Sequence, residues 1–161
     1  MKMIPLALLV ASVSNVCQAQ AVRIERDVSL ALASRLADDA MSSCADRSFN
    51  VSVVVVDRDG LVRVSLRGDL AGPHTLLAAQ QKAYTSSSSG VQTQQLGERA
   101  QAPGGAAYLA NIPGFLLLGG GVPIKAGSEV IGAIGVAGAP RGIEDEQCAV
   151  AAIDKSRESL K

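Results

Sequence analysis

The chain has 161 residues, with 15 lysines and arginines balanced by 15 aspartates and glutamates. This length fits one domain with a core of ordinary size. The zero net charge and the aromatic content of 2% argue against a nucleic-acid-binding protein, which needs a basic surface and aromatic side chains for stacking.

A secretory signal peptide is predicted at the start of the chain. One lysine precedes an apolar run from Ile4 to Val13, and small residues follow. This order is typical of a signal peptide at residues 1–19, with cleavage after Ala19 or Ala21. The run is shorter than the ~20 apolar residues of a membrane-spanning helix, and no later segment is apolar enough. We therefore expect a periplasmic or secreted protein without a membrane span, whose residues 22–161 form a single domain.

The first half of the chain predicts the order helix, strand, strand, helix. Apolar residues recur every four positions over residues 27–44, which indicates an amphipathic helix. Residues 51–56 are β-branched and apolar on both faces, so they are expected to form a central strand. An Asp-Gly turn then leads to a strand of alternating polarity. A second helix is predicted from His74 to about Thr85, where a serine run is expected to end it.

The second half predicts three strands and a last helix. Residues 92–112 have weak periodicity and are interpreted as one or two short helices with a loop. Strands are predicted at residues 115–118, 122–125 and 129–137, and a helix with acidic residues in its first turn follows Pro140. The order is therefore α-β-β-α-(loop)-β-β-β-α. It predicts an α+β fold with a five-stranded, mainly antiparallel sheet layered by helices.

The cysteines predict a disulfide. Two of them, Cys44 and Cys148, remain after the predicted cleavage. An even pair in an oxidising compartment is most simply explained as a disulfide, whereas a catalytic thiol or a two-cysteine metal site has less support. Such a bridge would join the end of the first helix to the start of the last one.

Five motifs carry a family resemblance when they are taken in order. They read VVVVDRDG, PHTLLAAQQKAYTS, GGGVPI, VIGAIGVAGA and EDEQCAVAAI. With this order and spacing, residues 28–160 resemble the GlcG/HbpS family of haem-binding-type domains, which is related to the C-terminal domain of PduO-type proteins. The resemblance implies a profilin-like or PAS-like fold, assembly into a homo-oligomer, and haem as a cofactor that some members degrade.

Candidate ligand-binding residues lie on the second helix and near the glycine-rich strands. His74, the only histidine, is a candidate ligand of haem iron, and the alternative is a surface histidine that caps the helix. Lys82 is a candidate partner of a propionate, and the alternative is a solvated helix lysine. Tyr84 is able to ligate or stack, or simply to pack its ring in a half-buried position. The other candidates are a polar strand residue, a helix residue and two glycines that allow close approach: Arg67, Thr85, Gly120 and Gly121.

Other site chemistries have less support in the sequence. The glycine run at residues 119–121 lacks the Lys-Ser or Lys-Thr pair of a phosphate-binding loop. A Gly-x-Ser-x-Gly motif is missing, and nitrogen and sulfur ligands are too few for zinc. No catalytic residues can be assigned from the sequence. The family resemblance implies a small-ligand-binding protein, for haem or a related tetrapyrrole. Two alternatives stay open: an enzyme or accessory factor acting on a small organic acid, and a cofactor-free PAS-like sensory or scaffold module.

Overall fold

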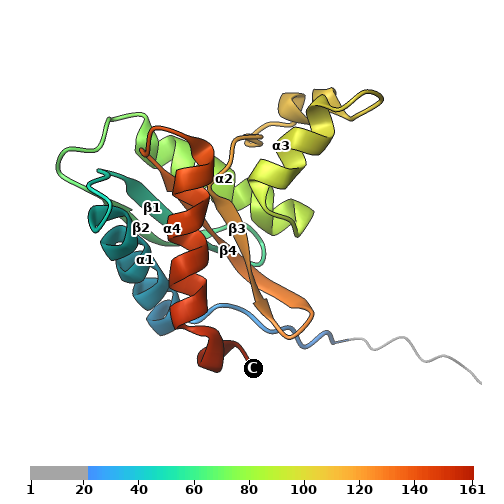
Figure 1. Ribbon diagram of the computed structural model, residues 1–161. Helices are drawn as coiled ribbons and strands as arrows, with labels where there is room; N and C mark the ends of the chain where they lie inside the picture. Colours follow the sequence, from blue (N-terminus) through green and yellow to red (C-terminus); the bar gives the residue numbers. More distant parts are fainter. Residues whose placement is uncertain (1–21) are drawn as a thin grey trace, which may run out of the picture.

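Runs of β-branched residues form a four-stranded antiparallel sheet in the computed structural model, which describes residues 22–161 (Figure 1). The strand order is β2-β1-β4-β3. The central strand β1 is buried along its whole length, as its unbroken valine run predicts. The predicted signal peptide lies outside the described residues. The strands are β1 (Ser52–Asp57), β2 (Val62–Arg67), β3 (Gly121–Ala126) and β4 (Glu129–Ala137).

Helices cover both faces of the sheet. α1 (Leu30–Ala45) and α4 (Gly142–Lys155) lie side by side on one face, and α2 (Thr75–Ser89) covers the other. α3 (Thr93–Gln101) stands away from the sheet beside the end of α2 (Figure 1). Two short 3-10 helices, η1 (Ala107–Asn111) and η2 (Arg157–Leu160), complete the fold. No helix within the described part of the chain is long and apolar enough to cross a membrane.

The predicted antiparallel α+β fold is confirmed, but the prediction of five strands is wrong. Residues 115–118 form an irregular segment instead of a strand. The N–H of Leu116 donates to Thr85 Oγ1 at 2.8 Å, and the carbonyl of Leu118 accepts from Thr93 Oγ1 at 2.6 Å. Because side chains of two helices use these backbone groups, they do not pair with a neighbouring strand.

The second helix continues beyond the predicted end at Thr85. It includes the serine run and ends at Gly90, which has a left-handed φ of 71°. The hydroxyl of Ser89 donates to the carbonyl of Thr85 at 2.7 Å, and that of Ser86 donates to the carbonyl of Val91 at 2.9 Å. Ser86 and Ser89 therefore satisfy their hydroxyls on local backbone, Ser87 donates to carbonyls of the β1–β2 turn, and the run does not interrupt the helix.

Small residues of β4 let α2 pack directly on the sheet. Ala133, Gly135 and Ala137 lie on the face that α2 covers. A side-chain carbon at Gly135 would lie 2.0 Å from the carbonyl oxygen of Ala79 in α2. The flat face that the sequence predicts is therefore occupied mainly by a helix of the same chain.

The larger core lies between the sheet and the pair α1 and α4. Its fully buried members include Leu36, Val53 and Ile134. The predicted disulfide between Cys44 and Cys148 is confirmed, with both residues fully buried and their Cα atoms 5.5 Å apart. It fastens the end of α1 to the second turn of α4.

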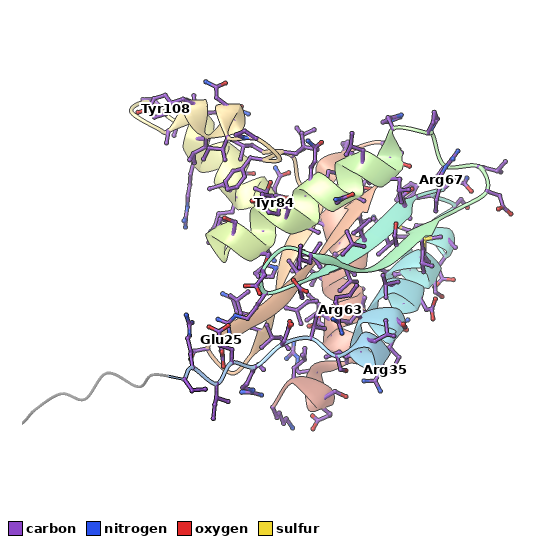
Figure 2. The ribbon with its side chains drawn as sticks, turned by 180° about the vertical axis from the view of Figure 1, so that it is seen from behind. Glu25, Arg35, Arg63, Arg67, Tyr84 and Tyr108 are labelled. Atoms are coloured by element: carbon purple, nitrogen blue, oxygen red, sulfur yellow. A yellow bond between two sulfur atoms is a disulfide. The ribbon has the colours of Figure 1, made fainter. Side chains whose placement is uncertain are left out.

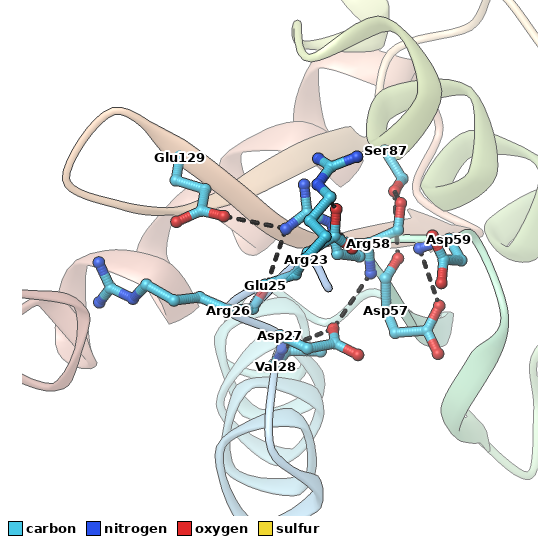
Figure 3. A network of polar contacts seen from close by, with 10 residues as sticks. All are labelled: Arg23, Glu25, Arg26, Asp27, Val28, Asp57, Arg58, Asp59, Ser87 and Glu129. Carbon is cyan, nitrogen blue, oxygen red and sulfur yellow. Dashed lines mark hydrogen bonds and ion pairs between the residues drawn. The ribbon is translucent and has the colours of Figure 1, made fainter. Parts of the chain in front are cut away.

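The segment before α1 is held by an ion-pair network around Arg58 (Figure 3). The guanidinium of Arg58 bonds the carboxylate of Glu129 at 2.9 Å and lies 3.4 Å from that of Glu25. It also donates to the carbonyl of Arg26 at 3.2 Å, while the N–H of Arg58 donates to Asp27. This network ties residues 25–27 to the β1–β2 turn and the β3–β4 hairpin.

Candidate functional site

A cavity of about 730 Å³ lies between the first half of α2, α3 and the loop that leads into α4. Its volume falls within the range of about 300–1,000 Å³ that is usual for small-molecule sites. Exposed residues such as His74, Asn50 and Gln101 form its rim, and buried residues form its floor. Apolar side chains of Phe49, Leu70, Leu117 and Leu118 line parts of the wall.

One face of α2 contributes His74, Ala78 and Lys82, which are spaced by one helical turn. His74 is exposed at the helix start, and its imidazole makes no capping hydrogen bond. A side-chain carbon at Gly72 would lie 2.9 Å from His74 Cε1, so the glycine leaves room for the ring. The imidazole thus stands at the rim of the cavity without a structural partner in the helix cap.

Lys82 is buried at the cavity floor rather than solvated. Its Nζ donates to Asp145 Oδ2 at 2.8 Å and to the carbonyl of Val136 at 3.0 Å. Both charged side chains are 5% exposed or less. Burial raises the pKa of the Asp145 carboxyl, while the attraction of Lys82 and the N–H of Ala139 oppose that rise. The carboxylate that Lys82 binds is therefore one of the protein's own.

The neighbouring Glu146 fastens two other parts of the wall. Its Oε2 accepts from the N–H of Gln94 at 3.1 Å and from that of Gly120 at 3.3 Å. Burial raises the pKa of Glu146, although both N–H donors favour the charged form. Adjacent acidic residues of α4 thus hold α2, α3 and the glycine run in one arrangement.

The two candidate glycines serve the packing of this wall. Gly120 has a φ of 124°, and a side-chain carbon there would lie 2.4 Å from the carbonyl oxygen of Val136. The N–H of Gly121 donates to Thr93 Oγ1 at 2.8 Å. A side-chain carbon at Gly121 would lie 2.3 Å from the carbonyl oxygen of Lys82. Their N–H groups are used within the protein, and neither glycine lines the cavity.

Tyr84 and Thr85 also lie outside the cavity. Tyr84 projects from α2 (Figure 2). Its ring packs against Gly60 and Gly114 and meets Phe115 edge to face, with centroids 6.1 Å apart. Thr85 is fully buried and donates to the carbonyl of Gln81 at 2.7 Å. These contacts fit the packing role that was the alternative for Tyr84.

Arg67 braces the loop that follows β2. Its Nε and Nη2 both donate to the carbonyl of Ala71, at 3.0 and 2.8 Å. Figure 2 shows Arg67 beside this loop. It does not line the cavity. Of the seven candidate ligand-binding residues, the structure therefore brings only His74 and Lys82 together at one cavity.

The sequence interpretation missed the wall formed by α3 and the role of Asp145. Gln94, Gly97, Glu98 and Gln101 all line the cavity. Their spacing of three and four residues is helical, but these residues are polar or glycine, whereas an amphipathic helix is predicted from a stripe of apolar residues. Asp145 was interpreted as a helix-start residue only. Among residues 22–161, no group of three or more metal-ligating side chains is placed to hold a metal ion.

Comparison with known proteins gives one family and several similar structures. The sequence model of the family described as "Haem degrading protein HbpS-like" matches residues 28–154. A double mutant of HbpS from Streptomyces reticuli is 37% identical, with a TM-score of 0.80 over 94% of this chain and 98% of that one. No curated protein matches the chain.

Two further structures share the fold. Protein ORFY of Klebsiella pneumoniae is 26% identical, with a TM-score of 0.78 over 85% of this chain and 95% of that one. A complex of PduOC with haem is 24% identical, with a TM-score of 0.72 over 80% of this chain and 94% of that one. At that identity, the last comparison shows a common fold only.

Proposed function

Since the chain belongs to the HbpS-like family, we propose that it is an exported protein that binds haem or a related tetrapyrrole in the cavity between α2 and α3. The observation that carries the proposal is the exposed imidazole of His74 at the rim of a cavity of about 730 Å³. Two comparisons support the proposal. The description of the family names haem-degrading proteins, and the PduOC structure with the same fold is a complex with haem.

The residues around the cavity fit a large, flat and partly apolar ligand. Phe49, Leu70 and Leu117 offer apolar surface for a macrocycle, and His74 offers a nitrogen ligand for iron. Because His74 is the only histidine in the chain, ligation by two histidines of one chain is excluded. Bound haem would supply a redox-active iron whose potential depends on its axial ligand and its surroundings.

The other cavity residues have positioning roles in this proposal. Lys82 and Asp145 form a closed ion pair that fixes the floor, and Glu146 holds α3 against the glycine run. A wall fastened in this way presents a preformed site, so that less ordering is needed when the ligand binds. We also propose that the protein is exported and forms a homo-oligomer. N-terminal sequencing of the secreted protein and gel filtration test these two points.

A haemin titration followed by absorbance tests the function. We expect a saturable Soret shift for the protein, and loss of the ligated spectrum in His74→Ala with a fall in affinity of about tenfold or more. Tyr84→Phe is the matched control because its ring lies outside the cavity, and it should bind like the wild type. An unchanged spectrum in His74→Ala would remove His74 as the iron ligand. Absence of any saturable shift would refute the proposed function.

A further inference from the structure

The charged side chains that line the cavity leave no free cation for a ligand carboxylate. The titratable residues of the lining are His74, Lys82, Glu98 and Asp145. Lys82 is the only lysine or arginine of the lining within residues 22–161, and its Nζ is already bound to Asp145 and to a backbone carbonyl. The ion pair is buried and its two charges cancel, so the floor offers an incoming anion no net attraction.

Glu98 adds a negative charge that no cation balances. Its Oε1 accepts a hydrogen bond from Gln94 Nε2 at 2.8 Å, and it takes part in no salt bridge in the described part of the chain. Glu146 lies buried behind the same wall and forms no salt bridge within residues 22–161. Burial raises the pKa of Glu146; the N–H groups of Gln94 and Gly120 oppose that rise, and the smaller influences of Glu98 and Lys82 act in opposite directions. The lining therefore carries one unpaired carboxylate, that of the exposed Glu98, beside a neutral ion pair.

A carboxylate placed inside such a cavity is unfavourable. It would lose its water shell without gaining a cation, since the hydroxyl of Thr75 already donates to the carbonyl of Gly72 at 2.7 Å and the amide of Gln94 is neutral. The exposed rim, by contrast, keeps carboxylates hydrated. The macrocycle and the carboxylates of a tetrapyrrole thus have opposite preferences in this site.

We propose that the cavity takes up the macrocycle of a tetrapyrrole and leaves its carboxylates in solvent, and that the exposed Glu98 is a specificity-determining residue that disfavours ligand carboxylates beside α3. This inference rests on the proposed haem-binding function. It also disfavours a small organic acid bound through its carboxylate, because such a ligand would meet Glu98 and an ion pair that is already closed.

Haemin and haemin dimethyl ester, which lacks both negative charges, separate the two orientations. We expect the wild type to bind the ester at least as tightly as haemin. Glu98→Gln should bind haemin about two- to five-fold more tightly, since exposed charges of this kind interact modestly, and should bind the ester as the wild type does. Glu158→Gln makes the same charge change outside the cavity and serves as the control. Added salt should raise the affinity of the wild type for haemin by screening the repulsion.

The outcomes distinguish this inference from the function on which it rests. Loss of about tenfold or more in affinity on esterification, or weaker haemin binding by Glu98→Gln, would overturn the orientation while haem binding stands. Failure of both porphyrins to bind would overturn the proposed function and the orientation with it. Equal haemin affinities of Glu98→Gln and the wild type would remove Glu98 from the account of specificity.

Discussion

Removal of the disulfide is expected to destabilise the fold by about 4–5 kcal/mol. Cys44 and Cys148 are separated by 104 residues in the sequence, and the bridge closes that loop in the unfolded chain as well. For a loop of about 100 residues, the chain-entropy model gives about 4.7 kcal/mol of stabilisation. This is a large part of the total of about 5–15 kcal/mol that is usual for a domain.

The test compares the urea-induced and thermal unfolding of residues 22–161 with and without the double substitution Cys44→Ala/Cys148→Ala. Both cysteines are fully buried among apolar residues, so alanine keeps the surroundings apolar and introduces no unpaired polar group. We expect the Tm to fall by about 10–20 °C. The urea m-value should rise, because the unfolded chain without the bridge is more expanded and exposes more surface.

The m-value separates an effect on the unfolded state from lost packing. Wild-type protein whose disulfide has been reduced should unfold at the same urea concentration as the double variant. A loss below about 1 kcal/mol would refute the loop-closure argument, since that amount is within the usual effect of a single core substitution. A large loss with an unchanged m-value would assign the effect to packing in the folded state instead.

Three further predictions concern charged residues. Lys82→Met should destabilise the fold by about 3–5 kcal/mol because it leaves Asp145 buried without a cation, and Lys82→Met/Asp145→Asn should recover part of that loss in urea titrations. Burial raises the pKa of Glu146 in the folded state, so its contribution to stability is present at acidic pH and is lost as the pH rises through the raised pKa. The side chain of Glu146→Gln cannot titrate. The free energy of unfolding of this variant, relative to that of the wild type, should therefore rise as the pH increases from acidic to neutral. Arg58→Ala should cost less than about 1 kcal/mol but should speed amide hydrogen exchange of the segment before α1.

Each of these predictions has a result that contradicts it. Additive losses in the double variant of Lys82 and Asp145 would show that the two charges are not coupled. Parallel pH profiles of Glu146→Gln and the wild type would show that Glu146 has the same pKa in both states. Unchanged hydrogen exchange in Arg58→Ala would mean that other contacts hold the segment before α1.

Local patterns in the sequence predicted most of the elements. The four-residue period before Cys44 predicted α1, although the helix begins at Leu30, where Ser29 caps it by accepting from the N–H of Leu32 at 3.2 Å. The valine run predicted β1 and its central position, and the pairing of Cys148 with Cys44 followed from their number. In each case the information lies in neighbouring residues or in the cysteine count.

Features that depend on distant partners could not be predicted. Residues 115–118 are apolar, as in a buried strand. Their backbone groups, however, are hydrogen-bonded to the hydroxyls of Thr85 and Thr93, which belong to two different helices. Lys82 was a candidate partner of a propionate, with a solvated helix lysine as the alternative, because its partner Asp145 lies 63 residues later and could not be identified from the sequence. The family resemblance located the candidate site near α2, whereas the contribution of α3 required the three-dimensional arrangement.

The dependence of the cavity on α4 determines when the site can form during synthesis. Asp145 and Glu146, which lie near the end of the chain, hold walls formed by residues about 25 to 65 positions earlier. While the ribosome still holds α4, Lys82 lacks its partner and α3 lacks its fastening to the glycine run. A nascent or truncated chain without α4 is therefore expected to bind no ligand in this cavity.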